Sequence, residues 1–172
     1  HGEISPAFKE WKNAKEAPGN ESIKIHSVRI INEKQDIVET LDIRKKIGIE
    51  IFFRQYKKSD PIIPVIALYN GKGQHIFNAI DTDSEWKKPR EVGNYTCIAW
   101  IPGNLLNEER YYVTVALNTL VSGGTIRQAI ANEVVSFQVF DPLLGDSAKG
   151  YFTRKWEGAI SPLLNWNVVK ED

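Results

Sequence analysis

The stretch Ile47-Gly48-Ile49-Glu50-Ile51-Phe52-Phe53-Arg54 places a large apolar side chain at every second position. Side chains of a β-strand point alternately to opposite faces, so the odd-numbered residues of this stretch would share one buried face. The same period of two recurs in residues 23–31, 64–70, 74–80, 95–101, 111–117 and 133–140. Short strands separated by turn residues, with almost no helical periodicity, predict an all-β fold, an antiparallel sandwich.

A tyrosine at the start of one predicted strand refines the topology. In Leu105-Leu106-Asn107-Glu108-Glu109-Arg110-Tyr111, a leucine pair and a polar turn lead into Tyr111, as in the tyrosine corner of immunoglobulin-like sandwiches. We therefore expect strands 47–56 and 93–101 to pair in one sheet. Strands 64–70, 109–119 and 133–140 would form the other. The alternative is that Tyr111 is an ordinary core residue.

Composition excludes several classes of protein. The 172 residues carry 22 Lys and Arg against 22 Asp and Glu, which argues against a nucleic-acid-binding module. The longest apolar stretch, residues 61–69, is far shorter than the roughly 20 residues of a membrane span. The lone Cys97 cannot form an internal disulfide, so the cytoplasm is the default compartment.

The N-terminal residues 1–21 are expected to be a linker, and residues 22–172 the folded domain. The linker contains Ser5-Pro6 and Pro18-Gly19-Asn20. The spacing of Ile4, Phe8 and Trp11 fits a short helical face, which would dock or be disordered. Because the chain starts with His1-Gly2 and has no Met, we interpret it as an excised fragment.

Signatures of catalysis are missing from the sequence. It has no GxxxxGK[ST], GxGxxG, CxxC or HExxH motif, so we predict no catalytic residue, no metal site and no cofactor. Cys97 belongs on the inward face of its strand, and His26 and His75 are interpreted as solvated or capping residues. In the acidic loop, Asp81, Asp83 and Glu85 leave two alternatives open: a loose calcium site and a glycosidase acid–base pair.

Aromatic residues carry the positive signal. Alternation places Phe52, Ile98, Trp100 and Tyr112 on outward faces, and exposed apolar surface usually marks an interface. Aromatic rings beside hydrogen-bonding side chains suit the apolar C–H face and polar rim of a sugar. Another protein chain could cover the same surface.

The order of motifs resembles the C-terminal carbohydrate-binding domain of the ATP-binding subunit of bacterial O-antigen polysaccharide ABC transporters. The resemblance covers nearly the whole chain and rests on these segments: residues 23–31, 46–51, 93–95, 101–106, 110–113, 135–139 and 158–162, followed by Trp166. It implies an immunoglobulin-like sandwich that recognises the exported glycan, often through its non-reducing end.

The resemblance also implies the partners. The phosphate loop would lie in an ATPase domain before His1, through which the domain would join the transmembrane subunit. The protein would then be cytoplasmic and peripheral to the inner membrane. It would form a homodimer, in which the C-terminal strand, here Leu163–Val169, can be exchanged between protomers.

We therefore expect a non-catalytic glycan-binding module that binds an O-antigen-type polysaccharide. The binding residues are expected on the outward face of strands 47–56 and 93–101: Phe52, Arg54, Ile98, Trp100, Glu50 and Thr96. The first alternative is a structural domain whose aromatic surface serves dimerisation alone, and the second is a glycoside hydrolase.

Overall fold

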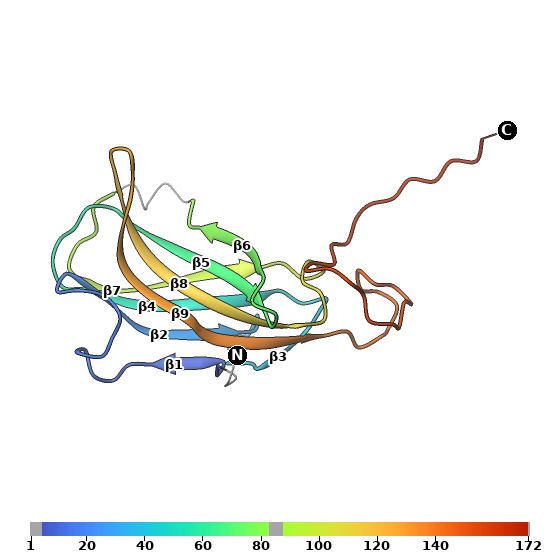
Figure 1. The fold of residues 1–172 in the computed structure, drawn as a ribbon, viewed down its shortest axis with the longest axis horizontal. Helices are drawn as coiled ribbons and strands as arrows, with labels where there is room; N and C mark the ends of the chain where they lie inside the picture. Colours follow the sequence, from blue (N-terminus) through green and yellow to red (C-terminus); the bar gives the residue numbers. More distant parts are fainter. Residues whose placement is uncertain (1–4, 83–87, 172) are drawn as a thin grey trace.

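The strands of the protein form two layers in the computed structural model, which describes residues 5–82 and 88–171 (Figure 1). The strands in these ranges are β1 (Phe8–Glu10), β2 (Ile23–Ile31), β3 (Thr40–Asp42), β4 (Ile47–Gln55), β5 (Ile62–Asn70), β6 (His75–Ile80), β7 (Gly93–Ile101), β8 (Arg110–Val121) and β9 (Gly124–Phe140). The described residues contain no helix with the length and hydrophobicity needed to cross a membrane.

The strands pair as two sheets. Sheet A has the order β1-β2-β4-β7, and all of its pairs are antiparallel. Sheet B has the order β3-β9-β8-β5-β6. Its pairs are antiparallel except that β3 runs parallel to β9. The predicted pairing of strand 47–56 with 93–101, and of the other three strands with one another, is confirmed, as is the β-sandwich.

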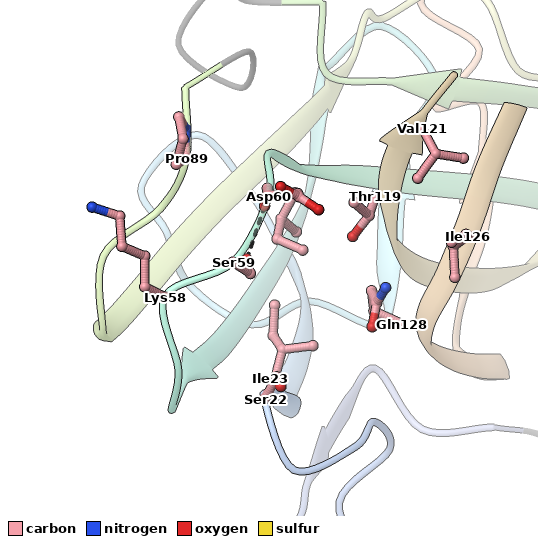
Figure 2. Close-up of a pocket in the computed structure, with 11 residues that line it drawn as sticks. Ser22, Ile23, Lys58, Ser59, Asp60, Pro89, Thr119, Val121, Ile126 and Gln128 are labelled. Atoms are coloured by element: carbon pink, nitrogen blue, oxygen red, sulfur yellow. Dashed lines mark hydrogen bonds between the residues drawn. The ribbon is translucent and has the colours of Figure 1, made fainter. Parts of the chain in front are cut away.

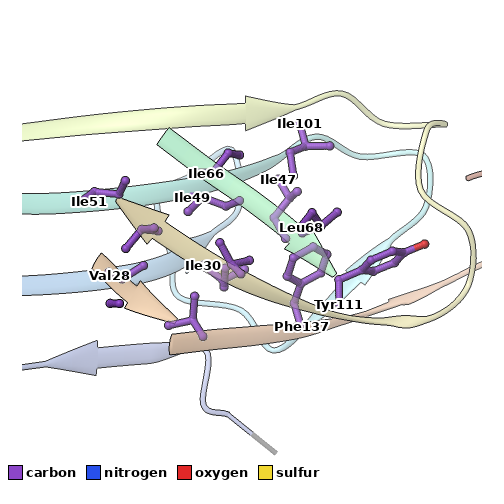
Figure 3. Close-up of a cluster of buried hydrophobic side chains, with 14 of the residues drawn as sticks. Val28, Ile30, Ile47, Ile49, Ile51, Ile66, Leu68, Ile101, Tyr111 and Phe137 are labelled. Carbon is purple, nitrogen blue, oxygen red and sulfur yellow. The ribbon is translucent and has the colours of Figure 1, made fainter. Parts of the chain in front are cut away.

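The apolar side chains that recur at every second position fill the space between the sheets. Figure 3 shows Ile47, Ile49 and Ile51 of β4 directed toward Ile66 and Leu68 of β5. These side chains are almost completely buried. Because burying a Leu or Ile contributes about 1.5–3 kcal/mol, this shared layer is the main source of stability.

The N-terminal segment departs from the expected pattern. Phe8–Glu10 forms a strand on β2, not the helical turn that the spacing of Ile4, Phe8 and Trp11 would fit. The segment before β1 also docks, because the backbone carbonyl of Ser5 accepts a hydrogen bond from the hydroxyl of Ser136. That residues 1–21 join a preceding domain stays a prediction.

The hairpin of β8 and β9 is longer than predicted. It turns at Ser122 and Gly123, where Gly123 has a φ of 88°, and β9 begins at Gly124 instead of residue 133. The far end of the hairpin protrudes from the sandwich (Figure 1), so most of residues 124–128 are exposed on both faces. A strand without a buried face shows no hydrophobic alternation, which is why the sequence did not reveal it.

The tyrosine corner is confirmed. Tyr111 is completely buried, and its hydroxyl lies 3.1 Å from both the carbonyl oxygen of Asn107 and that of Ala159. Burial raises the pKa of this phenol, so it stays protonated as a donor. The amide of Asn107 donates to the carbonyls of Trp156 and Gly158, both at 2.8 Å. The corner therefore holds the segment after β9 against the sandwich.

The end of the chain lies away from the sandwich (Figure 1). Its last backbone hydrogen bond within the described residues runs from the N–H of Leu163 to the carbonyl of Asn104, at 3.0 Å. Beyond it, Trp166, Val168 and Val169 are 80–93% exposed. These apolar side chains are therefore not packed against the sandwich.

Replacing Tyr111 by Phe should destabilise the domain. The change removes one hydroxyl and leaves two buried carbonyls without that donor, so we expect the free energy of unfolding to fall by about 0.5–1.5 kcal/mol. Urea unfolding followed by circular dichroism measures this difference. An unchanged unfolding midpoint would show that the hydroxyl does not stabilise the corner.

Candidate functional site

The residues predicted from sequence lie together on the outward face of sheet A. In the antiparallel register of β4 and β7, Glu50 lies opposite Ile98 and Phe52 opposite Thr96. Trp100 lies opposite Gly48, one step further along the same face. Side chains directly opposite on one face are about 4.5–5.5 Å apart, so these residues form a continuous surface.

Trp100 depends on the glycine opposite to it. A Cβ atom at position 48 would lie 2.9 Å from Cζ3 of Trp100 and 2.7 Å from Cγ1 of Ile31. Both distances are too short, so only glycine lets the indole approach β4 this closely. The ring stays 39% exposed, and the ammonium of Lys46 lies 4.8 Å from its centroid. The surface therefore offers a supported aromatic ring with a cation beside it.

Glu50 is held by an arginine that sequence reasoning missed. Arg29 of β2 binds it through two hydrogen bonds, Nε to Oε1 and Nη2 to Oε2, both 2.7 Å long. The hydrogen bond that Arg29 donates to Glu50 raises the pKa of Arg29. Glu50 is only 8% exposed, so its carboxylate is engaged within the protein and positions Arg29. The available signal in the sequence was a basic residue, Arg29, at a position of strand 23–31 between the apolar Val28 and Ile30.

An aromatic cluster surrounds Phe52 at the other end of the surface. The β2–β4 register shifts between Ile25 and Ser27, and this bulge brings the ring of His26 to 6.1 Å from that of Phe52. His26 Nε2 lies 3.0 Å from the hydroxyl of Tyr56. The guanidinium of Arg54, an exposed side chain, lies 5.3 Å from the same tyrosine ring. His26 and Tyr56 are thus further members of the surface.

Two residues considered for other roles lie away from the outward face of sheet A. Tyr112 faces outward on sheet B as predicted, but it is only 6% exposed, because Tyr69 and Ser136 flank it in the register. Cys97 faces inward, and burial raises the pKa of its thiol to about 12. A thiol with this pKa is not a nucleophile near neutral pH.

Among the hollows formed by the described residues, one borders this surface and two lie elsewhere. The first, about 500 Å³, lies at the end of the sandwich, where Asp60, Thr119 and Gln128 line it (Figure 2). The second, about 520 Å³, lies beside β7 and is lined by Thr96, Ile98 and Trp100 of the predicted site together with Asp81. The third is on the outward face of sheet B.

The acidic loop contributes one described residue to these hollows. Asp81 lines the second one, whereas Asp83 and Glu85 lie outside the described residues. Within residues 5–82 and 88–171, no three His, Cys, Asp or Glu side chains gather into a group that would hold a metal ion. The predicted calcium alternative therefore stays a sequence-based hypothesis.

The sequence and structure were compared with known proteins. A family model described as the Wzt C-terminal domain matches residues 14–153. No curated protein sequence matches the chain. A solved structure titled "Crystal structure of the C-terminal domain of wzt" matches with a TM-score of 0.70 and 13% identity, covering 98% of each chain. At this identity, the structural match shows the fold.

Replacing Arg29 by Ala should destabilise the domain, because it leaves the buried carboxylate of Glu50 without its two donors. We expect the free energy of unfolding to fall by about 1–3 kcal/mol. Adding Glu50→Gln in the same chain should restore part of the loss, since a neutral amide is less costly to bury than a carboxylate. Chemical denaturation of the native protein and of these two variants measures both effects. Equal stability of Arg29→Ala and the native protein would contradict this role.

Proposed function

Because this chain belongs to the Wzt C-terminal domain family, we propose that it binds the polysaccharide exported by an O-antigen ABC transporter. Family membership itself assigns the chain a role in that transporter, as a non-catalytic C-terminal domain of the ATPase subunit. It is accordingly not an enzyme. The finer proposals are that the chain binds the glycan, forms a homodimer and works on the cytoplasmic side of the membrane, joined to the transmembrane subunit through an ATPase domain.

The observation that carries the proposal is the indole of Trp100 seated over Gly48. An aromatic ring that is held in place by its own sheet and is 39% exposed suits stacking against the C–H face of a pyranose. The flexible Lys46 side chain, whose ammonium lies over the ring, would move aside when the sugar binds. The surface extends from there over Ile98 and Thr96 to Phe52. Few side chains in it must be ordered when a ligand binds, because the neighbouring strands already hold them.

Polar groups along the same face complement the rim of a sugar. Arg29 keeps further N–H donors beyond the two given to Glu50, and Thr96 is exposed. Arg54 at the end of the surface would pair with a phosphate or carboxylate if the glycan carries one. The surface is open, so we expect a single sugar to bind weakly and a chain end to bind through several such contacts.

Replacing Trp100 by Ala should abolish detectable binding of polysaccharide. The side chain is 39% exposed and outside the core, so the melting temperature should change little. Titration calorimetry with the polysaccharide of the strain that encodes this chain measures binding. Tyr151→Ala, which removes an 87% exposed ring after β9, is the matched control. Normal binding by Trp100→Ala would show that the glycan binds elsewhere.

A second candidate function is dimerisation, and the exposed end of the chain favours it. Leu163, Leu164, Trp166, Val168 and Val169 are 58–93% exposed, although all are apolar. Contiguous exposed apolar residues usually mark an interface. Sheet A ends at β7 within the described residues, so its outer edge offers backbone groups to an added strand. We infer that these residues pack on a second copy of the chain.

Deleting the residues after Pro162 should therefore yield monomer or precipitate. Size-exclusion chromatography with light scattering measures the assembly directly. A truncated protein that still behaves as a stable dimer would dismiss strand exchange. A native dimer that binds no polysaccharide would favour the purely structural role.

A further inference from the structure

A groove of about 440 Å³ crosses the outward face of sheet B, on the opposite side of the molecule's core from the surface of Trp100. Small side chains form its floor. Ala67 of β5 lies opposite Thr114 of β8, and Val65 lies opposite Ala116. The residues between them point into the core, so the floor is fixed by the same alternation that builds the sandwich. We name this hollow the sheet B groove.

One wall of the sheet B groove comes from β6 and the end of β5. The rings of Tyr69 and His75 are 5.1 Å apart and tilted by 39°. His75 Nε2 lies 2.9 Å from Oδ1 of Asn78, which lines the groove beside Ala67. This wall therefore combines an aromatic face with an amide, the pairing that suits the apolar and polar sides of a sugar ring.

The opposite wall comes from β8 and β9 and contains an arginine and two amides. Arg127 lies directly opposite Asn118 in the β8–β9 register, and both line the groove. Oδ1 of Asn118 is buried and has no hydrogen-bond partner among the described residues. Buried acceptors are normally paired, so this one is ready for a donor brought by a ligand after a small rotation of the amide.

A bulge in β9 sets the position of the last wall residue, Asn132. Glu133 has a φ of 42°, in the left-handed region, and its N–H donates to the hydroxyl of Thr114 at 2.8 Å. The register shifts between Val113 and Val115 at this point. Bulges re-aim side chains and are common beside binding sites. Here the bulge lies next to Asn132, which lines the groove and is exposed.

The chemistry of the lining selects the class of ligand. Amides both donate and accept, as sugar hydroxyls do, and Asn78, Asn118 and Asn132 bring three of them around a floor of small side chains. No Asp or Glu lines this groove in the described residues, and Arg127 would tolerate or favour an acidic sugar. A protein interface would instead centre on a fully buried apolar cluster enriched in aromatic side chains.

We propose that the sheet B groove is a second subsite for a pyranose residue of the exported polysaccharide. This inference rests on the proposed function, and it places a contact on the sheet that does not carry Trp100. One polysaccharide chain, or two chain ends, would then contact both faces of the sandwich. Two weak contacts on one chain raise the overall affinity through effective concentration.

The test uses the whole chain and the polysaccharide released by mild acid from the lipopolysaccharide of the encoding strain. Calorimetric titrations compare native protein, Arg127→Ala, Asn132→Ala and the double variant. Both side chains are exposed, so melting temperatures should match the native value. The control is Arg154→Ala, an exposed arginine outside both sheets. We expect at least a tenfold loss of affinity in the double variant and none in the control.

Amide chemical shifts followed during the same titration locate the contact. Shifts of Ala67 and Ala116 on adding polysaccharide support the proposal, whether or not Trp100→Ala also weakens binding. Native-like binding by the double variant, with shifts confined to residues of sheet A, overturns the sheet B groove and leaves the proposed function standing. No binding by the native protein overturns both.

Discussion

The alternation of side chains along β4 is the constraint on which the rest of the structure depends. Ile47, Ile49, Ile51 and Phe53 must all leave water together, because they share one face of a strand. The apolar faces of β5 and β8 supply the opposite layer. Once these layers meet, the outward face of β4 is determined residue by residue, since a slip by one position would bury Glu50 and Arg54 in the core.

Part of the outward face of sheet A is closely packed. Gly48 has no side chain, so Ile31 and Trp100 both pack closely over its backbone. Arg29 forms a bidentate ion pair with Glu50. Such pairs need both partners, because either charge alone would be costly at this degree of burial. The result is a surface whose exposed ring and guanidinium have defined positions before any ligand arrives.

The tyrosine corner links the sandwich to the remainder of the chain. Tyr111 and Asn107 between them bind the backbone of residues 156, 158 and 159, a segment without regular strands. Backbone groups there would otherwise have few partners, and buried polar groups are normally satisfied. The corner fixes where the last residues leave the sandwich.

The sequence by itself determined the all-β class, the two sheets and the face on which Phe52 and Trp100 lie. These follow from local period-two alternation, from the turn residues between the strands and from the corner before Tyr111, each of which lies within about ten residues of sequence. The family resemblance rested on the order of the same segments.

Only the tertiary structure decided what those side chains contact. Arg29 meets Glu50 across 21 positions of sequence. Asn118 lies opposite Arg127 in a hairpin whose second strand begins with residues that have no buried face. Short strands such as β1 and β3 likewise exist because a longer strand pairs with them. The sheet B groove arises from small side chains on adjacent strands, and adjacency between strands is set by packing of the whole core, which no local pattern encodes.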